Sequence, residues 1–158
     1  MSKIMGLLVL VLSVQAFADV PVHEDRNEAE YNNQYGVVLN GYDPVSYFSE
    51  GGGMPLKGET TIAFNYGTRM YYFASEANLN TFKSNPLKYE PSYGSWCAYA
   101  MSQGSKVEIN PMIFTVNGNR LHFFISKSAK KSFDKDVTGH EKDADQVWSN
   151  FSGEKARK

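Results

Sequence analysis

The stretch Ile113-Phe114-Thr115-Val116-Asn117-Gly118-Asn119-Arg120-Leu121-His122-Phe123-Phe124-Ile125 contains two runs of strand-forming residues around the dipeptide Asn-Gly. Branched and aromatic side chains favour strands, and Asn-Gly is the favoured sequence of a two-residue hairpin turn. The stretch therefore predicts an antiparallel hairpin. In its second run, alternation places Arg120, His122 and Phe124 on one face and the intervening residues on the other.

A second hairpin is predicted earlier in the chain. The runs 60–64 and 69–73 are rich in branched and aromatic residues, and Asn65-Tyr66-Gly67-Thr68 joins them. The two hairpins indicate an α+β fold, with one small antiparallel sheet built from both hairpins and several short helices packed around it. No internal repeat is evident in the sequence.

Capping residues and apolar spacing predict the short helices. Asp43, Ser75, Ser95 and Thr138 each stand where an N-cap is needed, and Thr138 is followed three residues later by Glu141 in a capping-box spacing. The predicted helices span residues 45–50, 76–84, 96–103, 130–136 and 138–151.

Length and composition limit the class of protein. A chain of 158 residues suits one domain, and 42% apolar with 21% charged residues is typical of a globular protein. A net charge of −1 argues against nucleic acid as a partner. The single cysteine excludes an internal disulfide and a metal cage built of cysteine alone.

The first 18 residues have the pattern of a signal peptide. Lys3 precedes a short apolar run, which ends in the small residues Ala16 and Ala18. We expect cleavage after Ala18 and export of the mature protein, which would be periplasmic or secreted. No later segment has the length and apolarity of a membrane span.

The rest of the chain divides into three parts. Residues 19–35 are polar and predict a mobile leader or a short exposed helix. Residues 36–151 hold the predicted elements and form the expected domain. Residues 152–158 are predicted to be a frayed tail.

Four motifs occur in an order and spacing that resemble the YHS-domain family, in particular its small exported single-domain type. They are Gly41-Tyr42-Asp43-Pro44-Val45-Ser46-Tyr47-Phe48; Tyr72-Phe73-Ala74-Ser75 through Phe82 to Asn85-Pro86-Leu87-Lys88-Tyr89; Pro91-Ser92-Tyr93-Gly94-Ser95-Trp96-Cys97-Ala98-Tyr99-Ala100; and Ala144-Asp145 with Trp148. The resemblance covers residues 36–148. It implies a small α+β fold and the binding of heavy-metal ions, often copper. Metal-type members carry cysteines at the positions that Ala74 and Asn78 hold here.

Cys97 is the first candidate for a metal ligand. With Ser95 as the N-cap, Cys97 would lie in the first helical turn, where the helix dipole favours the thiolate. A thiolate is a soft ligand for Cu(I) and also a nucleophile. A buried, inert cysteine is the alternative.

His122 and Asp43 are the candidate partners of Cys97. Imidazole is the commonest metal ligand in proteins, although a lone histidine on a strand is more often packed or solvated. Asp43 can supply a carboxylate, although an N-cap role already accounts for it.

The sequence leaves three functions open. The first is an exported domain that binds or senses a soft metal ion such as copper through Cys97, with His122 or Asp43. The second is a non-catalytic structural or protein-interaction domain that has lost metal binding, with an unidentified protein as partner. The third is a redox protein that uses Cys97 alone. No catalytic triad, P-loop or dinucleotide motif is recognised, so we do not expect an enzyme.

Overall fold

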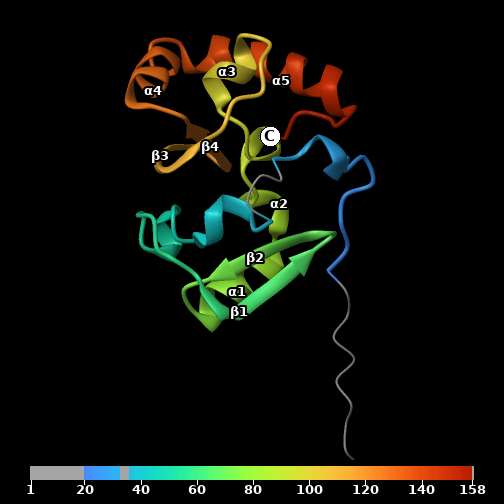
Figure 1. The fold of residues 1–158 in the computed structure, drawn as a ribbon, viewed down its shortest axis with the longest axis vertical. Helices are drawn as coiled ribbons and strands as arrows, with labels where there is room; N and C mark the ends of the chain where they lie inside the picture. The colour runs from blue at the N-terminus through green and yellow to red at the C-terminus, as the bar shows by residue number, and fades with distance from the viewer. Residues whose placement is uncertain (1–19, 33–35, 158) are drawn as a thin grey trace, which may run out of the picture.

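The computed structural model describes residues 20–32 and 36–157. Figure 1 shows two halves stacked along the long axis, with the first hairpin and α1 in the lower half and the second hairpin, α3, α4 and α5 in the upper half. In chain order the elements are η1 (Glu28–Glu30), η2 (Val38–Gly41), η3 (Ser49–Gly51), β1 (Glu59–Tyr66), β2 (Arg69–Phe73), α1 (Glu76–Ser84), α2 (Pro86–Tyr89), η4 (Ser92–Ser95), α3 (Ala98–Ser102), β3 (Asn110–Asn117), β4 (Arg120–Phe124), α4 (Lys127–Phe133) and α5 (Val137–Ser152).

The α+β class and both hairpins are confirmed, but the hairpins do not share one sheet. β1 pairs with β2, and β3 pairs with β4, both antiparallel. Among the described residues, β2 also makes one parallel bridge, Val37 to Met70, and β4 makes two, Pro91 to Leu121 and Cys97 to Phe123. These bridges come from connecting segments rather than from the other hairpin, so two separate two-stranded sheets result.

The alternation predicted for the last strand is confirmed, because β4 lies between two apolar clusters. Leu121 and Phe123 belong to the cluster of the first half, together with Phe73 and Phe82. Phe124 belongs to the cluster of the second half. One strand thus contributes to both cores and fixes how the two halves stack.

The helices differ from the prediction at their N-termini. Residues 45–50 form turns followed by η3 rather than an α-helix. Helix α4 begins at Lys127 with Ser126 as its N-cap, and α5 begins at Val137, because the Asp136 carboxylate accepts the backbone N–H of Gly139 at 3.0 Å. Only α1, capped by Ser75, has the predicted bounds.

The two end segments are packed against each other. Of the two alternatives predicted for the leader, the short helix is present as η1 and the mobile segment is wrong for residues 20–32, and the prediction of a frayed tail is wrong for residues 153–157. The backbone N–H of Asn27 donates to Oε1 of Glu154 at 2.8 Å, and that of Lys155 donates to Oδ2 of Asp25 at 2.7 Å. Glu154 is 1% exposed and accepts Nε1–H of Trp148 at 3.1 Å. Polar composition misled the prediction here, because these polar groups bind one another.

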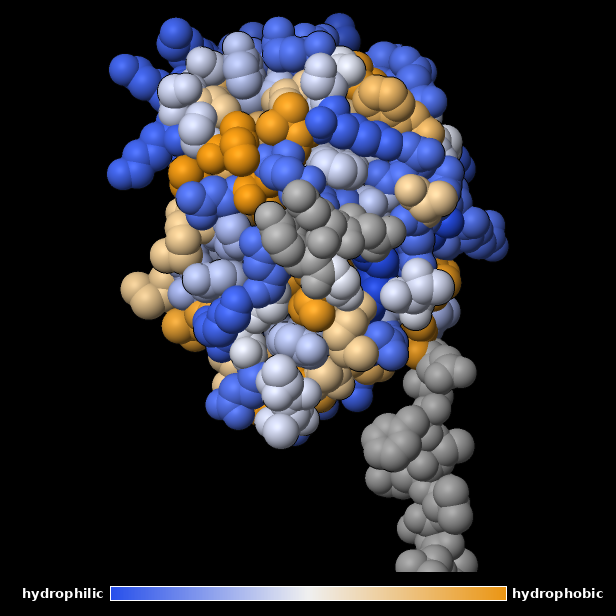
Figure 2. Space-filling view, viewed as in Figure 1, coloured by the Kyte–Doolittle hydropathy of each residue, from blue (hydrophilic) through white to orange (hydrophobic). Residues whose placement is uncertain are grey.

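The predicted signal peptide, residues 1–18, lies outside the described residues. Within residues 20–32 and 36–157, no helix has the length and apolarity that crossing a membrane requires. Figure 2 shows hydrophilic side chains over the α4–α5 end of the molecule and apolar side chains reaching the surface next to it, over the second hairpin.

Candidate functional site

Cys97 is buried and lies at the start of α3. Its side chain is 0% exposed and belongs to the apolar cluster that contains Met101 and Phe124. Cys97 is itself the N-cap residue, whereas Ser95 lies in η4 at a φ of 69° and does not cap the helix. The N-cap therefore lies two residues later than predicted, and Cys97 precedes the first helical turn. The thiol is enclosed by the core.

Asp43 is also buried, and both oxygens of its carboxylate accept hydrogen bonds. Oδ1 accepts the backbone N–H of Val45 at 2.8 Å. Oδ2 accepts the backbone N–H of Ala74 at 2.8 Å and Nδ2–H of Asn78 at 2.7 Å. Ala74 and Asn78 hold the positions at which metal-type relatives are expected to carry cysteine. In this chain the same positions serve to anchor Asp43.

His122 is fully buried on β4 and pairs with a carboxylate from α5. Its Nε2 lies 2.6 Å from Oε1 of Glu141, and its ring stacks on Tyr93 with centroids 5.6 Å apart. Nδ1 is buried without a hydrogen-bond partner among the described residues. Burial lowers the pKa of His122 despite the hydrogen bond with Glu141. The ring is therefore held neutral at neutral pH.

An open cavity of about 540 Å³ borders the carboxylate side of this pair. Arg120 and Asp145 line it with Glu141, and Nη2 of Arg120 lies 2.5 Å from Oδ1 of Asp145. The hydroxyl of Tyr93 donates to the same oxygen at 3.1 Å. Burial opposes ionisation of Glu141, but hydrogen bonds from His122 and Asn117 outweigh it and lower its pKa. Glu141, Arg120, Asp145 and Tyr93 thus form a hydrogen-bonded polar group beside a cavity.

The three residues selected from the sequence do not form a metal site. Within the described residues, no three His, Cys, Asp or Glu side chains gather in a group that could hold a metal ion. Cys97 is enclosed by apolar side chains, and both carboxylate oxygens of Asp43 accept hydrogen bonds. Nε2 of His122 is engaged by Glu141. The donor set therefore does not fit a copper ion.

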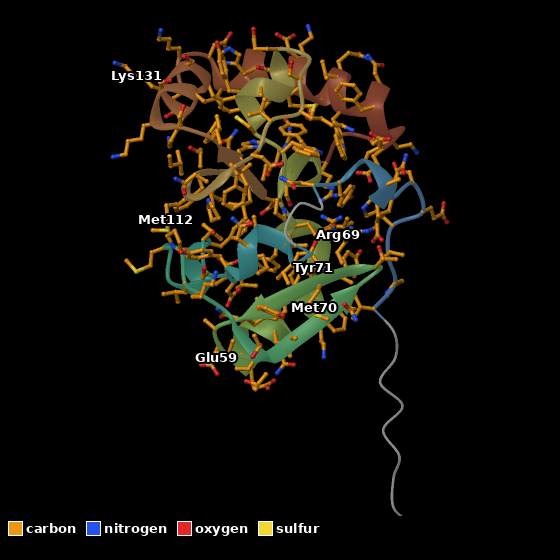
Figure 3. All side chains as sticks on the ribbon, viewed as in Figure 1. Glu59, Arg69, Met70, Tyr71, Met112 and Lys131 are labelled. Carbon is orange, nitrogen blue, oxygen red and sulfur yellow. The ribbon has the colours of Figure 1, made fainter. Side chains whose placement is uncertain are left out.

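A second polar centre, which the sequence did not suggest, surrounds Glu90. Its side chain is 1% exposed and accepts the hydroxyl of Tyr71 at 2.5 Å. Nη1 of Arg26 lies 2.6 Å from both carboxylate oxygens, and Nη1 of Arg157 lies 3.3 Å from Oε2. The two arginines come from the two end segments. Figure 3 shows Arg69 and Tyr71 on the side of β2 toward the other half of the molecule, and Met70 on the opposite side. The partners are far apart in sequence, so no local motif could have revealed it.

Comparison with known proteins gives one family. The family model of the YHS domain matches residues 47–93. Neither the curated proteins nor the solved structures contain a match to this chain. The matched segment runs from Tyr47 through the first hairpin, α1, α2 and Glu90 to Tyr93 in η4. Residues 47–93 are therefore similar to the YHS domain, and this match lies within the span of residues 36–148 over which the sequence motifs predicted the resemblance.

Proposed function

We propose that this protein is an exported, non-catalytic interaction domain of the YHS type, in which Cys97 is a core residue and not a metal ligand. The YHS family is often linked to the handling of metals such as copper. The observation that carries the proposal is the burial of Cys97, at 0% exposure among apolar side chains. A thiolate ligand or nucleophile needs access and an electropositive setting, and a buried structural cysteine is inert.

Asp43 and His122 support the same proposal. Both carboxylate oxygens of Asp43 accept hydrogen bonds from donors of the fold, and Nε2 of His122 is engaged by Glu141, whereas Nδ1 of His122 has no partner among the described residues. Recruiting Asp43 or Nε2 of His122 to a metal ion would break buried hydrogen bonds, each of which stabilises the fold by about 1.5–3 kcal/mol when a charged group takes part.

Copper affinity tests the proposal directly. Cu(I) is titrated by chelator competition into wild type and the Cys97→Ala variant, with Met101→Leu as a matched control in the same cluster. We expect the same weak affinity for all three proteins. Tight 1:1 binding by wild type that Cys97→Ala abolishes and Met101→Leu retains would refute the proposal.

Thiol labelling separates the redox alternative. Iodoacetamide should modify Cys97 only after the protein is unfolded in denaturant. Rapid labelling of the native protein would favour the redox function instead.

Export is tested on the protein isolated from its natural host. We expect the intact mass of the mature protein to begin at Asp19, in the periplasm or the medium. A cytoplasmic protein that retains residues 1–18 would contradict this part of the proposal.

A further inference from the structure

The two halves of the molecule begin with the same unusual backbone. Leu39, Asn40 and Gly41 have φ values of 55°, 54° and 80°, and Tyr93, Gly94 and Ser95 have values of 57°, 58° and 69°. Side chains disfavour this left-handed region by roughly 1–2 kcal/mol per residue. Three consecutive residues in this region, found twice in one chain, therefore indicate that the two halves have related backbone structures.

The residues that follow each triplet also make the same contact. The backbone N–H of Asp43 donates to the carbonyl of Leu56 at 2.9 Å, and that of Cys97 donates to the carbonyl of Val107 at 2.9 Å. Asp43 and Cys97 each stand two residues after their triplet. The two candidate ligands thus occupy one position of a common arrangement.

The hairpins match in detail. Each has a strand of eight residues, a two-residue turn that contains Gly67 or Gly118, and a strand of five residues. The register shifts between Glu59 and Ala63 in the first hairpin and between Asn110 and Phe114 in the second. These pairs are the same positions, 51 residues apart (110 − 59 and 114 − 63). The parallel bridges to Met70 and Leu121 also correspond.

The helix after each hairpin starts and packs alike. Ser75 caps α1 and Ser126 caps α4, and each hydroxyl accepts a backbone N–H at 3.1 Å. Phe82 packs on Phe73 with centroids at 5.3 Å and 59°. In the second half the same positions hold Phe133 and Phe124, at 5.2 Å and 60°.

The polar centres correspond as well. Tyr71 donates to Glu90, and His122 pairs with Glu141. Both members are displaced by the same 51 residues (122 − 71 and 141 − 90). Aligned on this offset, identical residues occur at Ile62/Ile113, Gly67/Gly118, Arg69/Arg120, Phe73/Phe124, Ser75/Ser126, Phe82/Phe133 and Glu90/Glu141.

We propose that residues 91–141 are a second, diverged copy of the unit formed by residues 37–90, so that the chain is a tandem of two YHS-type units. The second unit lies outside the segment that the family model matches, apart from its first three residues. This proposal replaces the expectation that the chain has no internal repeat. The segment that joins the triplet to the hairpin is three residues shorter in the second unit. The triplets are 54 residues apart (93 − 39), whereas the hairpins are 51 residues apart (110 − 59). This change of offset conceals the repeat in the sequence.

The duplication assigns roles to residues that differ between the copies. Cys97 holds the position of Asp43, and Ala129 holds that of Asn78. The hydrogen-bonded polar pair of the first unit is therefore replaced by an apolar pair in the second. The Tyr71–Glu90 centre is closed by Arg26, whereas the His122–Glu141 centre borders the open cavity.

A double-mutant cycle tests the equivalence. Cys97→Asp alone should destabilise the protein, because it buries a carboxylate without its amide donor. Adding Ala129→Asn should restore stability, with a coupling of about tenfold or more in the unfolding equilibrium constant. The control Cys97→Asp/Ala144→Asn places the amide elsewhere in the same cluster and should show no such coupling.

The duplication is supported if Ala129→Asn restores the stability of Cys97→Asp and Ala144→Asn does not. Additive effects at residue 129, or equal rescue at both positions, overturn it. If Cys97→Asp alone does not fold, the double variants Cys97→Asp/Ala129→Asn and Cys97→Asp/Ala144→Asn are compared with each other, and equal stability of the two overturns the proposal. Neither test measures copper or thiol reactivity, so its failure is distinct from failure of the proposed function.

Discussion

Nε2 of His122 lies 2.6 Å from Oε1 of Glu141 in the second half of the molecule, and the hydroxyl of Tyr71 lies 2.5 Å from Oε1 of Glu90 in the first half. A side chain on the second strand of each hairpin thus reaches a carboxylate that follows 19 residues later. The two centres hold their hairpins to the segments that come next. Of the two centres, the second contains an imidazole, whose ordinary pKa lies near neutral pH.

Stability should depend on pH through His122. Because burial lowers its pKa from the ordinary value of 6.5, the unfolded chain takes up a proton at a pH where the folded protein does not. The free energy of unfolding should therefore be at its full value above pH 6.5 and fall as the pH drops below it, by up to about 1.4 kcal/mol per unit. Urea unfolding between pH 5 and 8 measures this.

The variant His122→Gln serves as the comparison for this prediction. Glutamine can still donate a hydrogen bond to Glu141 but does not titrate. The free energy of unfolding of the variant should therefore vary less than that of wild type between pH 5 and 8. An NMR titration that gives His122 a pKa at or above 6.5 would contradict the prediction.

Replacing Cys97 by serine should cost more than replacing it by alanine. The hydroxyl of Cys97→Ser would be buried in an apolar cluster, at a cost of about 1–3 kcal/mol, whereas Cys97→Ala leaves only a small cavity worth about 1 kcal/mol. Guanidinium unfolding of both variants gives the two values. A serine variant as stable as wild type would show that a polar partner lies next to residue 97.

Removing Arg26 should destabilise the protein strongly. Arg26→Met leaves the buried carboxylate of Glu90 with Arg157 at 3.3 Å as its remaining cation, and breaking one side of a buried ion pair costs about 3–5 kcal/mol. The matched control is Lys106→Met, which removes a more exposed pair with Glu30 and should cost about 1 kcal/mol or less. Equal losses for both variants in thermal unfolding would argue against a buried centre at Glu90.

The ion pair of Glu50 with Lys88 should contribute stability only above acidic pH. The hydrogen bond from Lys88 lowers the pKa of Glu50 from 4.5 to about 2. Its contribution is therefore complete above pH 4.5 and disappears as the pH falls toward 2. Since both side chains are partly exposed, we expect only about 0.5–1 kcal/mol. Wild type and Glu50→Gln should differ by this amount at pH 6 and converge near pH 2, and a constant difference would contradict the assignment.

Local signals in the sequence sufficed for the hairpins and for α1. Branched and aromatic runs around Asn117-Gly118, and the Ser75 cap, specify backbone geometry within a few residues, so they can be interpreted without knowledge of the fold. The start of α5 was misjudged because Asp136 and Thr138 are both competent caps, and only packing decides between them.

The candidate site was much less predictable. Cys97, His122 and Asp43 were chosen for their chemistry, but burial and hydrogen-bond partners decide whether that chemistry is available. The partners of His122 and Glu90 come from segments far away in sequence, such as Glu141 and Arg26. The tandem arrangement was equally hidden, because its sparse identities become visible only when the left-handed triplets and the hairpins are superimposed.

The sequence by itself determined where the strands turn, which residues of β4 share a face and that the first unit resembles the YHS domain. These depend on local backbone preferences and on periodicity, which neighbouring residues carry. The tertiary structure alone decided that Cys97 is enclosed by apolar side chains, that the end segments pack over Glu90 and that the two units have related structures. These depend on contacts between distant segments, whose desolvation and hydrogen bonds no local pattern encodes.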